Sequence, residues 1–244
     1  MTAATPTILA TCGGMIPGTW TDAVYGPLLD FAIELADVSG RRPRVFHVNT
    51  AGGDQRVLEG QELEAARLTH VDASHLRLFP HPNVADLEAH LLSQDVIWVS
   101  GGSLVNLLAV WRAHGLPDIL HRAWQAGVVL AGGSAGGLVW HSGGTTSSFG
   151  PDIRTIPDGL GFLPGSLAVH YDSDPGRRPS FHAAIASGEV PDGYALEEGV
   201  GVRYSGVELV EVVAEAAGRR AFRVERTTDG VAETTLVPRL LPIH

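Results

Sequence analysis

The sequence predicts an α/β protein with a three-layer, doubly wound and mostly parallel sheet. Short apolar runs that are typical of buried strands alternate with helical patterns through the first 140 residues. Several of the strand-like runs end at clusters of glycine, which is typical of the loops that follow parallel strands. A β-rich section follows, and we expect it to join or flank the sheet rather than to form a second domain, so residues 1–244 are expected to be one domain.

The first half of the chain supplies the alternating elements. The strand-like runs lie at 7–11, 45–49, 76–79, 96–99 and 128–131. The helical patterns lie between them, at 23–38, 57–68, 84–92, 105–113 and 119–126. Asn83 precedes the third helix as an expected N-cap. Because strands that alternate with helices form βαβ units, these strands are predicted to be parallel neighbours.

Glycine clusters follow four of these strands, at residues 13–14, 52–53, 101–102 and 132–137. Ligands of open α/β sheets bind beyond the carboxyl ends of the strands. We therefore expect the four glycine loops to line one cleft.

The second half of the chain has a different pattern. Residues 142–165 are rich in Gly, Ser, Thr and Pro and are interpreted as a long loop, after which residues 167–170 form a strand and 179–186 a helix. Further strands are predicted at 199–204, 207–213, 221–225 and 231–236. Hairpin turns are expected at 204–207 and 228–230.

Composition excludes several classes of function. The net charge is −10, and every one of the 17 cationic Lys or Arg residues is an arginine, which excludes a Schiff-base lysine and a P-loop lysine. The arginines form no basic stripe, so nucleic acid is not an expected partner. No run reaches the roughly 20 apolar residues of a membrane span, and the first residues do not resemble a signal peptide, so we expect a cytoplasmic protein that binds no membrane. The single cysteine, Cys12, excludes an internal disulfide.

The segment 132–137, Gly-Gly-Ser-Ala-Gly-Gly, carries the strongest chemical signal. It follows an apolar strand and precedes a helical run, so Ser134 is expected at the apex of a sharp turn, where glycines permit positive φ. This geometry suits a nucleophile beside an oxyanion hole. The alternative is a serine that only caps a helix.

A nucleophilic serine needs a base, and His170 is the favoured candidate. It ends the strand at 167–170, so it is expected to face the same cleft as Ser134. The other histidines downstream of Ser134 are less well placed: His141 is two helical turns beyond the serine, His182 lies within a predicted helix, and His244 is the last residue.

At this point the chain resembles peptidase E, the S51 serine peptidases, which have the class I glutamine amidotransferase-like fold. The segments that carry the resemblance span roughly residues 5–225 and are 99–108, 133–136, 164–171 and 196–199, with 36 residues between Ser134 and His170. The resemblance implies that Ser134 is the nucleophile and His170 the general base. It also implies an oxyanion hole formed by the N–H of Ala135 and of Gly101 or Gly102, and hydrolysis of short peptides, with N-terminal aspartyl dipeptides as the family's known substrates.

One position departs from the family pattern. The family has an acid in a Thr-Thr-Asp-like stretch, where this chain has Thr145-Thr146-Ser147-Ser148. A serine can orient the histidine but cannot stabilise an imidazolium by charge. We expect Ser147 to be the hydrogen-bond partner of His170, helped by an acid such as Glu198; Asp152 and Asp158 are the other acids that could take this role.

Substrate-binding residues are expected around the same loops. Arg177 and Arg178 are candidates for binding a carboxylate, and Ser103, Tyr171 and Asp172 for lining the pocket. Because Ser103 stands where the family often has asparagine, aspartate specificity is not assumed.

Three alternative functions have distinguishing features, and the glutaminase is disfavoured because the single cysteine, Cys12, lies on the first strand and not at the turn. An α/β-hydrolase-type esterase would need a late histidine, and a glutaminase would need a cysteine at position 134. A weakly catalytic or non-catalytic binding protein would explain Ser147. His75 and His81 lack a complete metal-ligand set, and no cofactor motif occurs, so neither a metal nor a cofactor is expected. The chain is expected to be a monomer or a homodimer.

Overall fold

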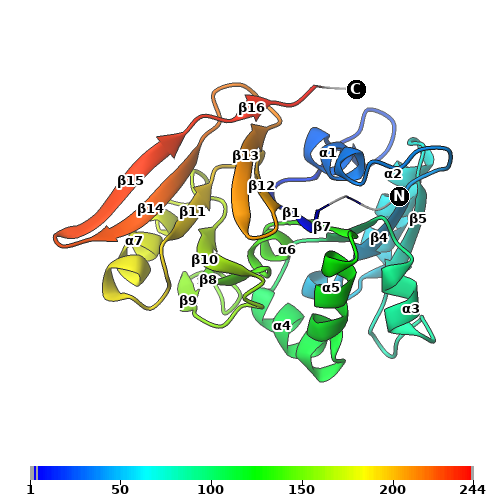
Figure 1. The fold of residues 1–244 in the computed structure, drawn as a ribbon, viewed down its shortest axis with the longest axis horizontal. Helices are drawn as coiled ribbons and strands as arrows, with labels where there is room; N and C mark the ends of the chain where they lie inside the picture. The colour runs from blue at the N-terminus through cyan, green and yellow to red at the C-terminus, as the bar shows by residue number, and fades with distance from the viewer. Residues whose placement is uncertain (1–2, 4, 243–244) are drawn as a thin grey trace.

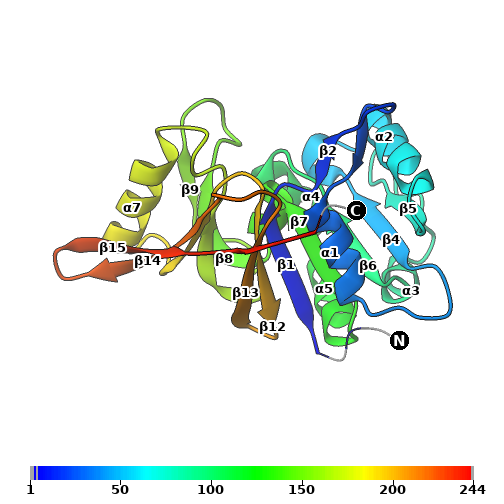
Figure 2. The ribbon, with the colours of Figure 1, turned by 90° about the horizontal axis from the view of Figure 1, so that it is seen from above.

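The computed structural model, which describes residues 3 and 5–242, contains two large sheets that lie side by side (Figures 1 and 2) and a two-stranded sheet. The larger sheet has eight strands in the order β16-β13-β12-β1-β7-β6-β4-β5. Its parallel half comprises β1 (Thr7–Cys12), β4 (Arg44–Val48), β5 (Asp72–Leu76), β6 (Val96–Val99) and β7 (Val129–Gly133). Beyond β1, the sheet continues through β12 (Val200–Ser205), β13 (Glu208–Ala214) and β16 (Arg239–Leu240).

Helices cover both faces of the parallel strands, which confirms the predicted three-layer, doubly wound fold. Successive side chains of a strand point to opposite faces, so Ile8 and Ala10 join one apolar core while Leu9 joins the other. One core contains residues of α1 (Pro27–Leu35) and α2 (Arg56–Arg67). The other contains residues of α3 (Leu87–Leu92), α4 (Leu104–Ala113) and α5 (Leu116–Gln125). In the part of the chain that is described, no helix has the length and apolar character of a membrane span.

The smaller sheet has six strands in the order β15-β14-β11-β10-β8-β9. These strands are β8 (His141–Thr146), β9 (Arg154–Ile156), β10 (Leu163–Ala168), β11 (Gly193–Leu196), β14 (Ala221–Thr227) and β15 (Gly230–Leu236). Helix α7 (Arg177–Ser187) packs Phe181 and Ile185 against Phe222 and Val224 of β14. Three short elements complete the fold: the hairpin of β2 (Met15–Pro17) and β3 (Ala23–Tyr25), a 3₁₀ turn at Thr50–Gly52, and α6 (Ala135–Leu138).

The predicted loop at 142–165 is wrong, because it contains β8, β9 and the start of β10. The glycines in β8 are typical of a loop, because glycine weakens a strand unless another chain segment approaches closely. Here such an approach exists: a Cβ on Gly144 would lie 2.0 Å from the carbonyl oxygen of Leu167 on the neighbouring strand β10. Packing between strands therefore outweighs the low strand propensity of these residues.

Smaller corrections concern the ends of elements. The segment predicted as a helix at 23–38 begins as strand β3, and the strand predicted at 76–79 lies at 72–76. The N-cap of α3 is Asp86, whose Oδ1 accepts from Ala89 N at 2.9 Å, whereas Asn83 accepts from Arg77 N. The two hairpin turns predicted in the β-rich C-terminal section are confirmed by the pairing of Ser205 with Glu208 and of Thr227 with Gly230.

Candidate active site

Ser134 occupies a strained turn between β7 and α6. Its φ of 57° and ψ of −118° are unusual for a residue with a side chain. The surrounding backbone holds this conformation: Ser134 N donates to Thr11 O at 2.9 Å, and Leu138 N donates to Ser134 O at 2.9 Å. A serine in such a turn projects its hydroxyl beyond the end of the strand, which is the arrangement of a nucleophile elbow.

The glycines around Ser134 serve close packing rather than positive φ. Among the residues of this turn it is Ser134 itself that has positive φ, so the expectation that the glycines supply it is wrong. A Cβ on Gly136 would lie 1.9 Å from Val99 O, and one on Gly133 would lie 2.4 Å from Gly13 O. The glycines thus allow the turn to press against β6 and the end of β1.

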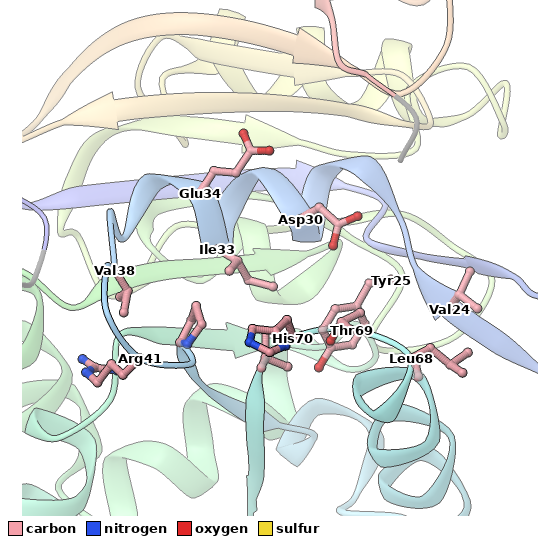
Figure 3. A pocket seen from close by; sticks show the side chains of 13 residues that line it. Val24, Tyr25, Asp30, Ile33, Glu34, Val38, Arg41, Leu68, Thr69 and His70 are labelled. Carbon is pink, nitrogen blue, oxygen red and sulfur yellow. The ribbon is translucent and has the colours of Figure 1, made fainter.

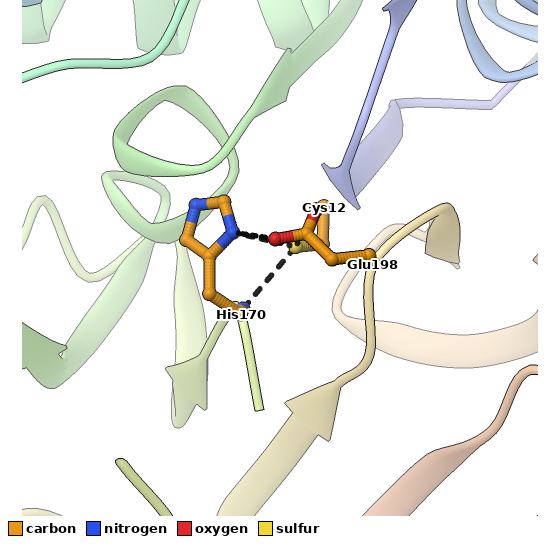
Figure 4. A group of neighbouring side chains, drawn as sticks. All are labelled: Cys12, His170 and Glu198. Atoms are coloured by element: carbon orange, nitrogen blue, oxygen red, sulfur yellow. Dashed lines mark hydrogen bonds and ion pairs between the residues drawn. The ribbon is translucent and has the colours of Figure 1, made fainter. Parts of the chain in front are cut away.

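His170 lies two residues beyond the end of β10 and also has positive φ, 58°. Its Nε2 is 2.8 Å from Ser134 Oγ. Its Nδ1 is hydrogen-bonded to Oε1 of Glu198, which follows β11 (Figure 4). Because a carboxylate only accepts hydrogen bonds, the proton is assigned to Nδ1, and Nε2 is free to accept the Ser134 proton.

Glu198, rather than Ser147, is therefore the partner of His170. Ser147 Oγ instead accepts from Arg177 Nη2 at 3.3 Å, so the expected contact between Ser147 and His170 is wrong. Asp172 holds the backbone of Glu198, since its Oδ1 accepts from Glu198 N at 2.9 Å while Arg219 binds its Oδ2 at 2.8 Å. The two other candidate acids are elsewhere: Asp152 is exposed, and Asp158 pairs with Arg112 at 3.0 Å.

Cys12, at the end of β1, is the neighbour that sequence reasoning missed. The fully buried sulfur lies 3.4 Å from His170 Nδ1 and 3.5 Å from Glu198 Oε2, and it accepts the backbone N–H of His170 at 3.2 Å. Burial, together with Glu198, raises the pKa of the Cys12 thiol above its ordinary value, so the group is a neutral thiol at neutral pH. The only signal for it was its position directly before Gly13-Gly14, a pair already expected at the cleft.

A cleft of about 220 Å³ opens beside Ser134. Glycines from three of the four predicted loops line it, namely Gly13, Gly101 and Gly133. The fourth loop does not line the cleft but contacts one of these loops, since a Cβ on Gly52 would be 3.8 Å from Gly101 O. The remaining lining residues are Met15, Trp98, Ser100, Ser134, His170 and Glu198.

Gly101 is closer to the nucleophile than Gly102 is. A Cβ on Gly101 would lie 3.2 Å from Ser134 Cβ, whereas one on Gly102 would lie 2.4 Å from Ala51 O, on the side away from the serine. Ala135 begins α6, and the first N–H groups of a helix have no acceptor within it.

The residues predicted to bind substrate are outside the lining of this cleft. Ser103 is the N-cap of α4 and accepts from Asn106 N at 3.2 Å. Tyr171 is buried and donates to Glu233 at 2.8 Å. Arg178 pairs with the same Glu233 and lies over the Tyr171 ring, 4.7 Å from its centroid. Asp172 contacts Glu198, as described above.

The other histidines belong to separate environments. His141 is fully buried beside the Tyr204 hydroxyl at 3.1 Å, and burial lowers its pKa to about 4. His182 contacts Glu233 at 2.9 Å. His244 lies outside the described residues.

A larger cavity, of about 670 Å³, lies between α1 and the end of α2 (Figure 3). Val24, Ile33, Val38 and Leu68 supply apolar wall, with Asp30 and His70 among the polar groups. Thr69 is the one serine, threonine or cysteine among its described lining residues, and its hydroxyl donates to the backbone carbonyl of Ala66 rather than to a base. We therefore assign the candidate active site to the smaller cleft, where Ser134 and His170 meet.

Comparisons with known proteins show the family to which this chain belongs. The family model described as peptidase family S51 matches residues 26–212. The uncharacterized peptidase YgaJ of Bacillus subtilis (strain 168) is 37% identical over 200 residues, which are 82% of this chain and 86% of that protein. A crystal structure of a peptidase from an acI-B1 Actinobacterium has a TM-score of 0.68 at 17% identity, covering 96% of this chain and 95% of the other. A putative peptidase E protein from Listeria monocytogenes EGD-e has a TM-score of 0.59 at 16% identity, covering 87% and 100%. The two solved structures support the fold, and the sequence matches establish that the chain belongs to peptidase family S51, the peptidase E family.

Proposed function

We propose that the protein hydrolyses short peptides as a serine peptidase. The observation that carries this proposal is the continuous set of contacts from Ser134 Oγ to His170 Nε2, at 2.8 Å, and from His170 Nδ1 to Glu198. In the proposed mechanism, His170 takes the Ser134 proton as the oxygen attacks the peptide carbonyl. Glu198 then stabilises the resulting imidazolium by its charge.

Backbone N–H groups of Ala135 and Gly101 are the proposed donors to the oxyanion. The start of α6 supports the first assignment, and the approach of Gly101 to Ser134 supports the second. One such donor is worth about 3 kcal/mol of transition-state stabilisation.

The cleft favours small substrates and gives no reason for a strict aspartate requirement. Its volume of about 220 Å³ suits a short peptide segment, and Met15 and Trp98 provide apolar surface. No cation is among its described lining residues, and Glu198 contributes a carboxylate there. We therefore propose short peptides as the substrate class, without a requirement for N-terminal aspartate.

The contact between Glu198 and His170 weakens the case for a non-catalytic binding protein. That alternative rested on Ser147 standing in place of an acid, but His170 has a carboxylate partner. The esterase alternative required a late histidine as base, whereas the histidine beside Ser134 is His170.

A dipeptide and tripeptide panel tests the proposal, with p-nitrophenyl esters measured in parallel. We expect peptide cleavage that Ser134→Ala lowers by about 10³-fold or more, with cleavage of both neutral and aspartyl peptides. Ser147→Ala is the matched control, because it removes a hydroxyl outside the cleft. Full activity of Ser134→Ala, or cleavage of esters alone, would contradict the proposal.

A further inference from the structure

The Cys12 thiol has no part in the proposed mechanism, yet its sulfur contacts two of the three proposed catalytic residues (Figure 4). Sγ is 3.4 Å from His170 Nδ1 and 3.5 Å from Glu198 Oε2. A thiol, an imidazole nitrogen and a carboxylate thus converge from three separate segments, the ends of β1, β10 and β11. All three are ligand types that bind Zn²⁺ in proteins.

We propose that Cys12 Sγ, His170 Nδ1 and the Glu198 carboxylate form a binding site for a zinc-type divalent cation. With Zn–S near 2.3 Å and Zn–N near 2.05 Å, tetrahedral ligation separates sulfur from nitrogen by about 3.5 Å. The sulfur already has that separation from both other ligands. Only the hydrogen bond between Nδ1 and Glu198 must open, to about 3.3 Å, and rotation of a partly exposed carboxylate can provide this movement.

Access and charge both favour a cation at this position. His170 and Glu198 line the open cleft, from which a water molecule can supply the fourth ligand. Glu198 brings a carboxylate oxygen within 3.5 Å of Sγ. A divalent cation bound between them neutralises this carboxylate, while the thiol proton leaves to solvent and the thiolate binds the metal. The N–H of His170, already directed at Sγ, then donates to the thiolate.

The second cluster of metal-ligand types, His47, Glu62 and His75, is already occupied by hydrogen bonds. Glu62 Oε2 accepts from His75 at 2.6 Å and from Asn49 at 2.8 Å, and Oε1 accepts from Ser100 at 2.7 Å. All three residues of the cluster are buried, so a metal would have to displace these donors without an open path. At the Cys12 site the sulfur is buried as well, but two of the three ligands, His170 and Glu198, line the open cleft.

Metal binding at Nδ1 changes which nitrogen of His170 carries the proton. In the metal-free state the proton is on Nδ1 and Nε2 accepts from Ser134. Coordination uses the Nδ1 lone pair, so a neutral imidazole must carry its proton on Nε2, and no general base remains for Ser134. The imidazole loses the proton on Nδ1 and gains one on Nε2, and no electron is transferred. Ser134 stays in place. This inhibitory consequence rests on the proposed peptidase function, whereas the metal site does not.

Cobalt provides a test of the site that needs no activity. Co²⁺ bound to a thiolate gives a charge-transfer absorption band, and Cys12 is the single cysteine of the chain, so the band reports this sulfur alone. We expect one equivalent of Co²⁺ to produce the band in the full-length chain and in Ser134→Ala, and Zn²⁺ to displace it. The band should disappear in Cys12→Ser, and Glu198→Gln should bind at least tenfold more weakly. Glu198→Gln keeps the thiol and decides the matter if Cys12→Ser does not fold.

Two results would overturn the metal site: no charge-transfer band in the unmodified chain, or equal Co²⁺ affinity in Glu198→Gln. For the inhibitory step, we expect Zn²⁺ to lower kcat of the unmodified protein at unchanged KM. Each protein is compared with its own metal-free rate, and the fold-decrease in kcat should be at least tenfold smaller in Cys12→Ser. Two results would contradict the proposed shift of the His170 proton to Nε2. One is an effect of Zn²⁺ on KM with kcat unchanged, and the other is equal inhibition of the unmodified protein and Cys12→Ser. If no peptide is cleaved but the cobalt band appears, the peptidase proposal fails and the metal site stands.

Discussion

At the level of single residues, the carboxylate of Glu198 determines how strong a general base His170 is. It accepts from His170 Nδ1, and the backbone N–H of Glu198 donates to Asp172, which Arg219 holds in place. A hydroxyl at that position would orient the imidazole without stabilising its positive charge. The charge develops only in the transition state, so Glu198 should act mainly on kcat.

We therefore expect Glu198→Gln to lower kcat by about 10³-fold with little change in KM, because the amide orients His170 poorly and carries no charge. Ser147→Ala should change kcat by less than about twofold, because Ser147 contacts Arg177 and not His170. Steady-state kinetics on one cleaved peptide compare the two variants. A large loss of kcat in Ser147→Ala, with Glu198→Gln unaffected, would restore the role that the sequence assigned to Ser147.

At the level of elements, the glycines near Ser134 are explained by the close approach of neighbouring backbone segments and not by a need for positive φ. The turn around Ser134 presses α6 against the last residue of β6, with the Cβ position of Gly136 1.9 Å from Val99 O. In contrast, Gly60 lies in the exposed face of α2 with nothing within 4 Å of its Cβ position. The same amino acid is required in one helix and replaceable in the other.

Substitution of these two glycines by alanine should therefore have opposite effects. We expect Gly136→Ala to lower the free energy of unfolding by about 3 kcal/mol, because the methyl group must displace backbone. Gly60→Ala should raise it by about 0.5–1 kcal/mol, because alanine is the better helix former and restricts the unfolded chain. Urea unfolding followed by circular dichroism measures both. A neutral Gly136→Ala would mean that the backbone of β6 moves freely, against the packing described here.

At the scale of the whole molecule, buried titratable groups set how stability depends on pH. His141 is fully buried, and burial lowers its pKa to about 4, from an ordinary value of 6.5. Between these two values the unfolded chain binds a proton that the folded chain does not bind, so stability falls as pH falls from about 6.5 to 4. A difference of 2.5 pH units corresponds to about 3 kcal/mol.

We expect His141→Gln to remove about this much of the loss in stability between pH 6.5 and 4, measured as urea midpoints at several pH values. His81→Gln serves as the control, because His81 is exposed and its replacement should leave the slope unchanged. Equal slopes in His141→Gln and the unmodified protein would mean that folding does not change proton binding at His141, against this prediction.

Glu62 should add a second loss of stability at lower pH. Burial alone would raise its pKa, but His47, His75 and Ser100 hold the pKa well below its usual range. Its contribution to stability is therefore present above the unfolded value, near 4.3, and is lost as pH falls through that value toward the lower folded pKa. Glu62→Gln should flatten the stability profile below pH 4.3 and cost about 3 kcal/mol at pH 7, because buried donors lose a charged acceptor. An unchanged acid profile would contradict this role.

The sequence by itself determined the parallel half of the main sheet, the serine turn and a histidine near the end of a strand. Each depends on local patterns: apolar runs of strand length, clusters of glycine after the strands, and the alternation of strands with helices. These patterns act within a few residues, so they are visible without knowledge of the partners of each strand.

Only the tertiary structure decided which acid meets His170 and that Cys12 lies beside both. Strands β10 and β11 are parallel neighbours, with Ala168 opposite Ala195, so the residues after each strand emerge at the same end of the sheet. His170 and Glu198 meet there although 28 residues separate them, and Cys12 arrives from 158 residues away. The sequence named Glu198 among several acids but favoured Ser147, because β8 to β10 appeared largely as a loop and the pairing of β10 with β11 was not predicted. Contacts between distant segments depend on which strands pair, and strand pairing is a property of the whole packed sheet rather than of any local run of residues.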